Sequence, residues 1–344
     1  MSLQAVFSRR IFYGCAIAIG GLCGVSARAQ SVADAISQEV RSVFDRSKNA
    51  VVKIEAVDDN CKLIGTGFFI DPGGTIFTSY TIGGESNSIV VSRGETKWAA
   101  KRVFADSHSG IAILKVESLT PLPFLPLGKS QALAVASPVM AIGYPMDLPV
   151  TPNFGTVGGF DIKYLDCYFP TSHIRANIPI QRGEGGAPLL NMNGEVVGIL
   201  ISWIDKGSGC FALPIEAADK VRSDFLRFGE VRPGWLGICV DVAPHEADGS
   251  FAQVAGLIAG APAEKFGVKK GDILLEVGDR KITSNEDMLD ASFYITAGDE
   301  IPITVSRNGE KVSLKVQAIE HPGIPRRIAP ASPEEAEVPL KAQR

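Results

Sequence analysis

The chain has 344 residues, of which 45% are hydrophobic and 21% are charged, and this composition is typical of folded globular domains rather than of disordered or fibrous proteins. This length accommodates about two or three domains. Lysine and arginine number 34 against 38 aspartate and glutamate residues, so the net charge is -4, which argues against nucleic acid as a partner.

The N-terminus has the pattern of an export signal. Arg9 and Arg10 precede an uncharged apolar run over residues 11–25, and Ala29 ends a small-x-small cleavage motif. The run is too short to span a bilayer, so we expect no stable membrane span. We predict that residues 1–29 are removed after Ala29 and that the mature chain is periplasmic or secreted. The arginine pair fits both the general secretory and the twin-arginine route.

The mature chain keeps four cysteines whose spacing fits no metal motif: Cys61, Cys167, Cys210 and Cys239. We therefore predict no metal site and no cofactor. An oxidising compartment permits disulfides, and the sequence leaves their pairing open. Burial statistics favour each cysteine as a small buried residue.

Residues 30–49 are predicted to form an N-terminal helix, because Ile36, Val40, Val43 and Phe44 recur at helical spacing. Short β-branched runs separated by turn residues then follow, at 51–56, 67–70, 89–91, 111–116, 139–143, 156–158 and 195–201. This spacing predicts an all-β barrel or sandwich over residues 50–228. Residues 215–228 are predicted to be a helix that closes this body.

Arg232-Pro233-Gly234 marks a break, after which a second domain is predicted over residues 229–320. Its sequence contains a strand near 268–277. Ser284 and Asp287 have the spacing of a capping box for a helix that reaches about Tyr294. Residues 321–344 are rich in Pro, Glu, Ala and Arg without periodicity, so this tail is predicted to be disordered.

Three stretches, at 65–79, 106–116 and 183–199, resemble the HtrA (Deg) family of serine proteases. In that family the corresponding segments deliver the catalytic histidine, the aspartate and the serine nucleophile. The resemblance covers nearly all of residues 50–320. It implies a mainly β fold, with a trypsin-like double β-barrel followed by a PDZ domain.

The resemblance places the family's histidine, aspartate and serine on Thr81, Gly110 and Gly185. Peptide cleavage by a triad needs a hydroxyl nucleophile, an imidazole base and a carboxylate that orients the imidazole. A small shift in alignment restores none of them, because there is no histidine before residue 108, no acidic residue at 107–116 and no serine at 173–201. Loss of nucleophile and base together costs about a million-fold in comparable dissections of a serine protease. The predicted active site is therefore degenerate.

Two histidines could in principle supply a relocated dyad. His108 lies near the lost aspartate and His173 near the lost serine, but neither is on a segment that would present it to Gly185. We expect both to be loop or surface histidines.

The loop is expected to retain the ability to bind peptide backbone, through the amide groups of Gly183, Glu184, Gly185 and Gly186. Ser202 and Trp203 resemble the edge strand that pairs with substrate in trypsin-like folds, where a peptide adds as a strand. The alternative is that the glycines only permit a tight turn and that Trp203 is a core or rim residue.

Residues 234–318 resemble a PDZ domain of the kind found in HtrA proteases. The resemblance implies a carboxylate-binding loop made of Gly234, Trp235, Leu236, Gly237 and Ile238. Peptide C-termini would bind there as an added strand beside helix 286–294, with Met288 and Ser292 lining the groove. The alternative is a groove that is closed or serves only subunit contacts.

Three functions follow from these patterns. The first is an exported, non-catalytic peptide-binding pseudoprotease that acts in protein quality control as a scaffold, chaperone or regulator in the cell envelope. The second is an active serine endopeptidase with a rearranged site. The third is an assembly subunit, and the resemblance alone implies a trimer.

Overall fold

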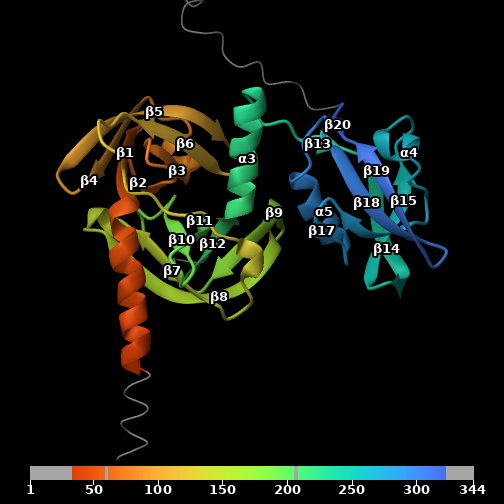
Figure 1. The fold of residues 1–344 in the computed structure, drawn as a ribbon, viewed down its shortest axis with the longest axis horizontal. Coiled ribbons are helices and arrows are strands. Elements are labelled where there is room, and N and C mark those ends of the chain that lie inside the picture. Colours follow the sequence, from red (N-terminus) through yellow and green to blue (C-terminus); the bar gives the residue numbers. More distant parts are fainter. Residues whose placement is uncertain (1–32, 59–60, 205–207, 323–344) are drawn as a thin grey trace, which may run out of the picture.

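The computed structural model describes residues 33–58, 61–204 and 208–322. The predicted export signal and nearly all of the predicted disordered tail lie outside these ranges. The described chain forms two stacked β-barrels and a smaller β module beside them (Figure 1). The predicted mainly β fold is therefore confirmed. No helix in these ranges is long and apolar enough to cross a membrane, and no cluster in them could hold a metal ion.

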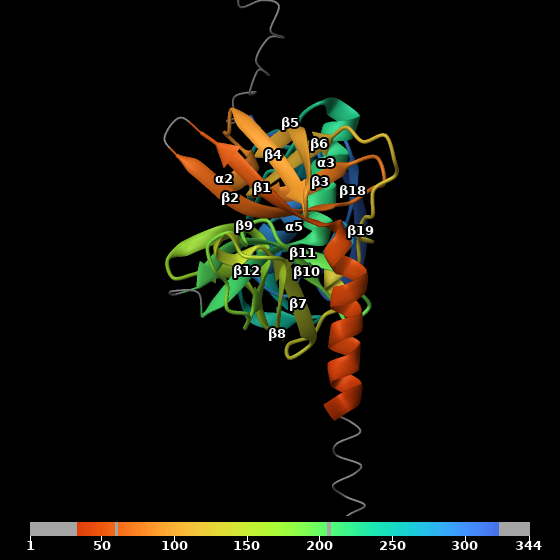
Figure 2. The same ribbon diagram turned by 90° about the vertical axis from the view of Figure 1, so that its left-hand side faces the viewer.

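Residues 33–47 form the N-terminal helix, and the 3-10 turn η1 (Lys48–Ala50) follows it. Val43 is fully buried, with Val40 and Phe44 packed against the same core. Ile36, one helical turn before Val40, is 57% exposed. Only the C-terminal part of this helix is therefore anchored, and the helix extends away from the barrels in both views (Figures 1 and 2).

The first barrel closes in the order β1-β2-β3-β6-β5-β4. Its strands are β1 (Val51–Val57), β2 (Lys62–Phe69), β3 (Thr75–Ser79), β4 (Ser88–Arg93), β5 (Thr96–Asp106) and β6 (Ile111–Val116). Alternate residues of β1, such as Val52 and Ile54, point into a buried cluster with Phe69 and Leu114. The short helix α2 (Tyr80–Gly83) directly follows β3.

The second barrel closes in the order β10-β11-β12-β9-β8-β7. Its strands are β7 (Pro138–Gly143), β8 (Thr151–Tyr164), β9 (Cys167–Ala176), β10 (Pro188–Leu190), β11 (Val196–Ile204) and β12 (Gly209–Pro214), and the turns η2 (Ser130–Ala132) and η3 (Pro145–Asp147) flank β7. Phe68 and Phe77 of the first barrel share one buried cluster with Met140 and Leu190 of the second. The two barrels thus pack on a common core.

Helix α3 (Ile215–Phe228) lies between the barrels and the C-terminal module (Figure 1), and the prediction of this helix is confirmed. Ile215, Ala218 and Val221 are buried against the common core. The helix ends at Gly229, whose φ of 77° is the left-handed conformation that favours glycine at this position.

The C-terminal module has a six-stranded sheet and a separate two-stranded sheet. Its elements are β13 (Gly234–Trp235), β14 (Ile238–Ala247), β15 (Ser250–Leu257), α4 (Pro262–Lys265), β16 (Ile273–Val277), β17 (Arg280–Lys281), α5 (Asn285–Phe293), β18 (Glu300–Arg307), β19 (Glu310–Gln317) and β20 (Ile319–Glu320). The predicted capping box is confirmed, because the Ser284 and Asp287 side chains each accept a hydrogen bond from the other's backbone amide. Tyr294, the predicted last residue of α5, caps it instead.

A mostly buried carboxylate joins the module to the second barrel. Asp290 of α5 accepts hydrogen bonds from Thr171 Oγ1 at 2.5 Å and from the Ser172 amide at 2.7 Å, both on β9. Its second oxygen pairs with Arg280 at 2.5 Å within the module. The side chains of this pair are only 17% and 14% exposed. Asp290 therefore links α5 to β9 by hydrogen bonds, and Arg280 neutralises its charge.

Replacing Asp290 with alanine is expected to destabilise the chain by about 3–5 kcal/mol, because Arg280 would be left mostly buried without its partner and the two hydrogen bonds to β9 would be lost. Urea unfolding should show a lower midpoint, and small-angle scattering should show a larger radius of gyration. Asp299→Ala is the matched control, since Asp299 also bridges the two bodies but pairs with the half-exposed Arg227. Equal effects of the two substitutions would contradict the role given to Asp290.

The expected burial of the cysteines is correct for one of the four. Cys210 is buried on β12, where burial raises the pKa of its thiol to about 12. Cys61, Cys167 and Cys239 are exposed. Residue-type statistics failed here because Cys61 directly precedes β2, Cys167 begins β9 and Cys239 lies on a solvent-facing position of β14.

Candidate functional site

The three positions that correspond to a catalytic triad come together between the barrels. Strand β3 ends at Ser79, and the next amide, that of Tyr80, donates to the Gly110 carbonyl at 2.7 Å. From the second barrel, the Gly185 carbonyl accepts from the Thr66 amide at 2.9 Å. These backbone bonds fix Thr81, Gly110 and Gly185 around one site without supplying a catalytic side chain.

The Thr81 hydroxyl stands at the position of the imidazole, and the Ser79 hydroxyl lies beside the empty position of the nucleophile. A Cβ added at Gly185 would lie 3.4 Å from Ser79 Oγ. Ser79 Oγ in turn lies 3.0 Å from Thr81 Oγ1. A Cβ at Gly110, whose φ is 78°, would lie 3.8 Å from Ile201 and thus face an apolar side chain. A hydroxyl is a poor base near neutral pH, so this arrangement offers no activated nucleophile.

Neither the neighbouring Asp106 nor the neighbouring His108 supplies a missing catalytic side chain. The Asp106 carboxylate accepts from the Ser109 amide at 2.9 Å and so caps its own turn. His108 is exposed, as predicted, and its ring stacks on Phe293 of α5 with centroids 6.2 Å apart.

The prediction of a surface position for His173 is wrong. The residue is fully buried on β9, with Nδ1 2.6 Å from the Thr171 carbonyl and its ring stacked on Phe169. Burial lowers the pKa of His173 to about 4, so it is neutral near pH 7. The sequence could not reveal this, because α5 of a different module packs against β9. His173 supports packing and is no relocated base.

The loop over residues 183–186 offers two amides rather than four. Gly186 N–H donates to the Leu200 carbonyl at 2.8 Å, and Glu184 N–H donates to the Gln181 carbonyl at 3.2 Å. Within the part of the chain that the structure describes, the amides of Gly183 and Gly185 have no acceptor. The loop therefore retains a pair of donors on either side of Glu184.

The Glu184 side chain is 1% exposed, although sequence reasoning considered only its backbone. One carboxylate oxygen accepts from Asn153 Nδ2 at 2.5 Å and the other from the Gln181 amide at 2.7 Å. Burial raises the pKa of this carboxyl. Sequence reasoning also missed Ser79, which was detectable from its position two residues before Thr81 at the end of a strand.

The C-terminal part of β11 presents an open strand edge. Ser202 and Trp203 pair with Phe211 and Cys210 of β12. On its other side, β11 pairs with β10 only as far as Ile199 among the described residues. Trp203 is 61% exposed and is therefore a rim residue. A peptide strand could add at this edge.

In the C-terminal module, the turn before β14 holds two free amides. The Leu236 carbonyl accepts from Ala263 N at 2.9 Å, and the Gly237 carbonyl accepts from Ile258 N at 3.0 Å. The amides of Leu236 and Gly237 have no acceptor within the described ranges. Gly237 has a φ of 75°, and an added Cβ would collide with Ala261, so only glycine fits.

An apolar surface lies between this turn and α5. Ile238 and Val240 of β14 and Met288 of α5 are partly buried against the module's core. Ser292 is half-buried and donates its hydroxyl to the Leu289 carbonyl at 2.7 Å. Met288 and Ser292 thus both lie on α5, which packs against β14.

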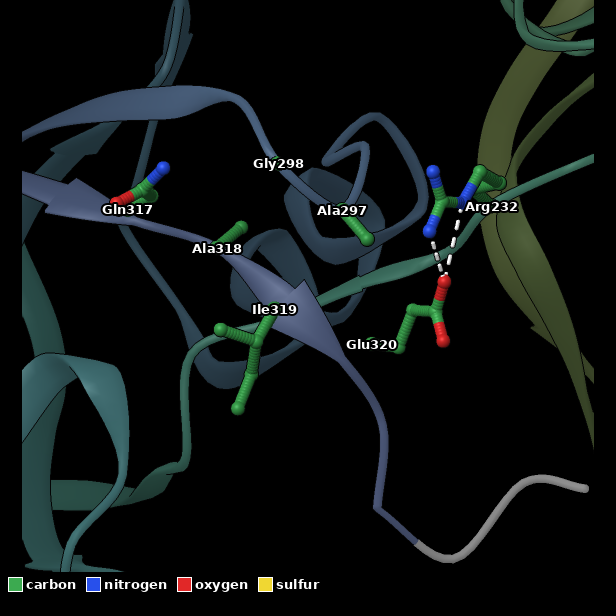
Figure 3. A pocket seen from close by; sticks show the side chains of 7 residues that line it. All are labelled: Arg232, Ala297, Gly298, Gln317, Ala318, Ile319 and Glu320. Carbon is green, nitrogen blue, oxygen red and sulfur yellow. Dashed lines mark hydrogen bonds and ion pairs between the residues drawn. The ribbon is translucent and has the colours of Figure 1, made fainter. Parts of the chain in front are cut away.

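A cavity of about 530 Å³ lies elsewhere, at the junction of the linker and the module (Figure 3). It is lined by Arg232, Ala297, Gly298, Gln317, Ala318, Ile319 and Glu320. Arg232 and Glu320 are paired with each other across it. It contains none of the residues predicted to bind peptide.

Comparison with known proteins accounts for this architecture. Residues 65–199 match the family of trypsin-like peptidase domains, and residues 236–318 match PDZ domains. The chain therefore combines a trypsin-like domain with a PDZ domain. All three triad positions lie within the first match, and Leu236 and Gly237 lie within the second.

Curated proteins similar to this chain are named as proteases. The protein named "Probable periplasmic serine endoprotease DegP-like" of Ectopseudomonas mendocina is 32% identical over 74% of this chain and 56% of its own length. The protein of the same name in Halomonas elongata is 31% identical over 75% and 57%. The chain thus spans little more than half the length of these curated relatives.

Solved structures show the same fold. The HtrA-type protease AlgW with a tripeptide superimposes with a TM-score of 0.66 over 82% of this chain and 97% of that one, at 24% identity. A serine endoprotease from Yersinia pestis gives 0.57 over 82% and 98%, also at 24% identity. The predicted double barrel with a PDZ domain is confirmed, and the predicted HtrA resemblance is supported.

Proposed function

We propose that this chain is an exported, non-catalytic HtrA-like protein that binds peptide segments of unfolded or partner proteins in the cell envelope. The observation that carries the proposal is the environment of Gly185. The nearest side-chain atom to its missing Cβ is the Ser79 hydroxyl, and the partner of that hydroxyl is Thr81. A nucleophile, a base and an orienting carboxylate are all absent from the triad positions.

Two features support retention of peptide binding in the trypsin-like domain. The free amides of Gly183 and Gly185 are suited to a backbone carbonyl oxygen. The open edge at Ser202 and Trp203 is suited to pairing with an extended segment. A chain held in this way would stay intact, because no group is available to attack its carbonyl carbon.

In the PDZ domain, the paired amides of Leu236 and Gly237 support recognition of a C-terminal carboxylate. The apolar surface formed by Ile238, Val240 and Met288 supports an apolar last residue. Gly234 and Trp235 complete the proposed loop by pairing with β20, which fixes its backbone.

A second candidate function is peptide hydrolysis, which is favoured by the names of the relatives as serine endoproteases. At the triad positions themselves, only Ser79 or Thr81 could act as nucleophile. In the described residues, neither side chain is hydrogen-bonded to an imidazole or a carboxylate. We therefore place it second.

The proposal includes location and assembly. The curated relatives are named periplasmic, and with the predicted signal over residues 1–29 this supports a site of action outside the cytoplasm. A trimer is proposed by resemblance to HtrA proteins. The part-exposed N-terminal helix is available for contacts between copies, since Ile36 is uncovered.

The proposal is tested by comparing two forms of one peptide with an apolar last residue. The free acid should bind the chain at least ~10-fold more tightly than the C-terminal amide, since charge-assisted hydrogen bonds are worth about 1.5–3 kcal/mol each. Isothermal titration measures both affinities. Met288→Glu or Ser292→Glu should weaken the acid form similarly by obstructing the groove, whereas Glu310→Gln at the exposed end of β19 should not.

If the free-acid and amide forms of the peptide bound with equal affinity, and Met288→Glu changed neither affinity, recognition of C-termini by the PDZ domain would be refuted.

A further inference from the structure

Glu184 introduces an uncompensated charge into the loop that replaces the nucleophile loop. Its carboxylate is buried and is held by two neutral amide groups, those of Asn153 and of the Gln181 backbone. In the described part of the chain, no basic side chain forms an ion pair with it. These hydrogen bonds solvate the carboxylate without neutralising it.

Glu184 lies in sequence between the two residues that supply the free donors of the loop, and its carboxylate is held close to that loop by the Gln181 amide. Gly183 and Gly185, whose amides lack acceptors, are the chain neighbours of Glu184. Paired amides in such a loop normally attract anions. A second negative charge bound close to a buried carboxylate is disfavoured by repulsion that corresponds to about 10- to 100-fold in affinity. The loop should therefore accept a neutral oxygen and reject an anion.

The other titratable groups around this carboxylate do not offset it. Arg182, in the same loop, is exposed, so solvent and salt screen its attraction for an anion. On the β7 side, burial raises the pKa of the Tyr144 phenol, and on β12 the Cys210 thiol has a pKa of about 12, so both are neutral. The contacting group from β8 is the uncharged Asn153 amide.

We propose that Glu184 makes this loop select the neutral carbonyls of internal peptide segments and exclude C-terminal carboxylates. The inference rests on the proposed peptide-binding function. The chain would then have two binding loops with opposite charge preference, and each would bind a different part of a polypeptide.

The test uses two small probes that differ only in terminal charge, N-acetyl-leucine and N-acetyl-leucinamide. The full mature chain is labelled with ¹⁵N-glycine, so that Gly183 and Gly185 report on the loop, and Gly234 and Gly237 report on the PDZ domain. In the wild type, the amide probe should shift Gly183 and Gly185 at a concentration at least ~10-fold lower than the acid probe. The PDZ glycines should show the opposite preference.

Glu184→Gln should abolish the loop's preference while leaving that of the PDZ glycines unchanged. Glu310→Gln changes the net charge equally at an exposed site and should leave both preferences intact. The wild type provides a test that does not depend on folding of the variant. Because burial raises the pKa of Glu184, acidification should shrink the loop's preference at a higher pH than that at which an ordinary exposed carboxyl takes up its proton.

Equal response of Gly183 and Gly185 to the two probes in the wild type, or an unchanged preference in Glu184→Gln, would overturn the charge selection. If the probes shift only Gly234 and Gly237, the loop takes no carbonyl and the inference fails, whereas peptide binding by the PDZ domain stands. If none of the four glycines responds, the proposed function fails with it.

Discussion

Unfolded casein incubated with the purified mature chain is expected to remain intact, and a fluorophosphonate probe is expected to leave the protein unlabelled. The physical reason is that Gly185 has no side chain and that Thr81, at the position of the base, has only a hydroxyl partner. Losing nucleophile and base together removes about a million-fold of rate. Gel electrophoresis over a day and fluorescence of the labelled band measure the two outcomes.

The matched variants separate intrinsic activity from a contaminating protease. Cleavage that disappears on replacing Ser79, Thr81, Cys167 or Ser202 with alanine would contradict the expected result. Cleavage unchanged by all four substitutions would be assigned to a contaminant. A fluorophosphonate adduct mapped to Ser79 would establish an activated hydroxyl at the site.

Gly186→Ala is expected to destabilise the chain by about 2–6 kcal/mol. Gly186 has a φ of 85°, which L side chains rarely adopt, and strain of this kind costs about 1–3 kcal/mol. An added Cβ would also lie 2.6 Å from the Ser79 amide nitrogen and in contact with the Thr66 carbonyl and the Thr78 hydroxyl. Overpacking adds about 1–3 kcal/mol more. Urea unfolding measures the loss.

Gly94→Ala is the matched control for backbone strain alone. Gly94 has a φ of 56°, but an added Cβ would meet nothing within 4 Å. This substitution should cost only about 1–2 kcal/mol. If the two substitutions were equally tolerated, the close packing of the loop against β2 and β3 would be contradicted.

The fold could be predicted well from sequence because local patterns specify it. The β-branched runs at 51–56 and 111–116 and the helix over 215–228 each carry their own periodicity, and the structure has them all. The capping box at Ser284 is likewise a local pattern. The ends of elements are less well specified by local patterns: α5 ends at Phe293, one residue before the predicted Tyr294.

The site could be predicted only in part, because its character depends on contacts between distant segments. The motifs located Thr81, Gly110 and Gly185. They did not show that Gly186 N–H is bound to Leu200, which reduces the available amides of the loop to two. They also could not show which side chains the fold buries.

His173 and Glu184 illustrate this limit. His173 is buried on β9, against which the distant helix α5 packs, and Glu184, in the loop before β10, accepts a hydrogen bond from Asn153 of β8. Local patterns carry no information about such packing, so burial of these titratable groups becomes visible only in the assembled structure.

Native mass spectrometry of the mature chain with an apolar C-terminal decapeptide tests the central claim most directly, since one spectrum resolves a non-covalent complex, an acyl-enzyme and free fragments. We predict the mass of the chain plus the intact peptide, with dissociation on mild activation returning the whole peptide. A covalent acyl adduct at Ser79 or Thr81, or the appearance of peptide fragments, would contradict non-catalytic binding.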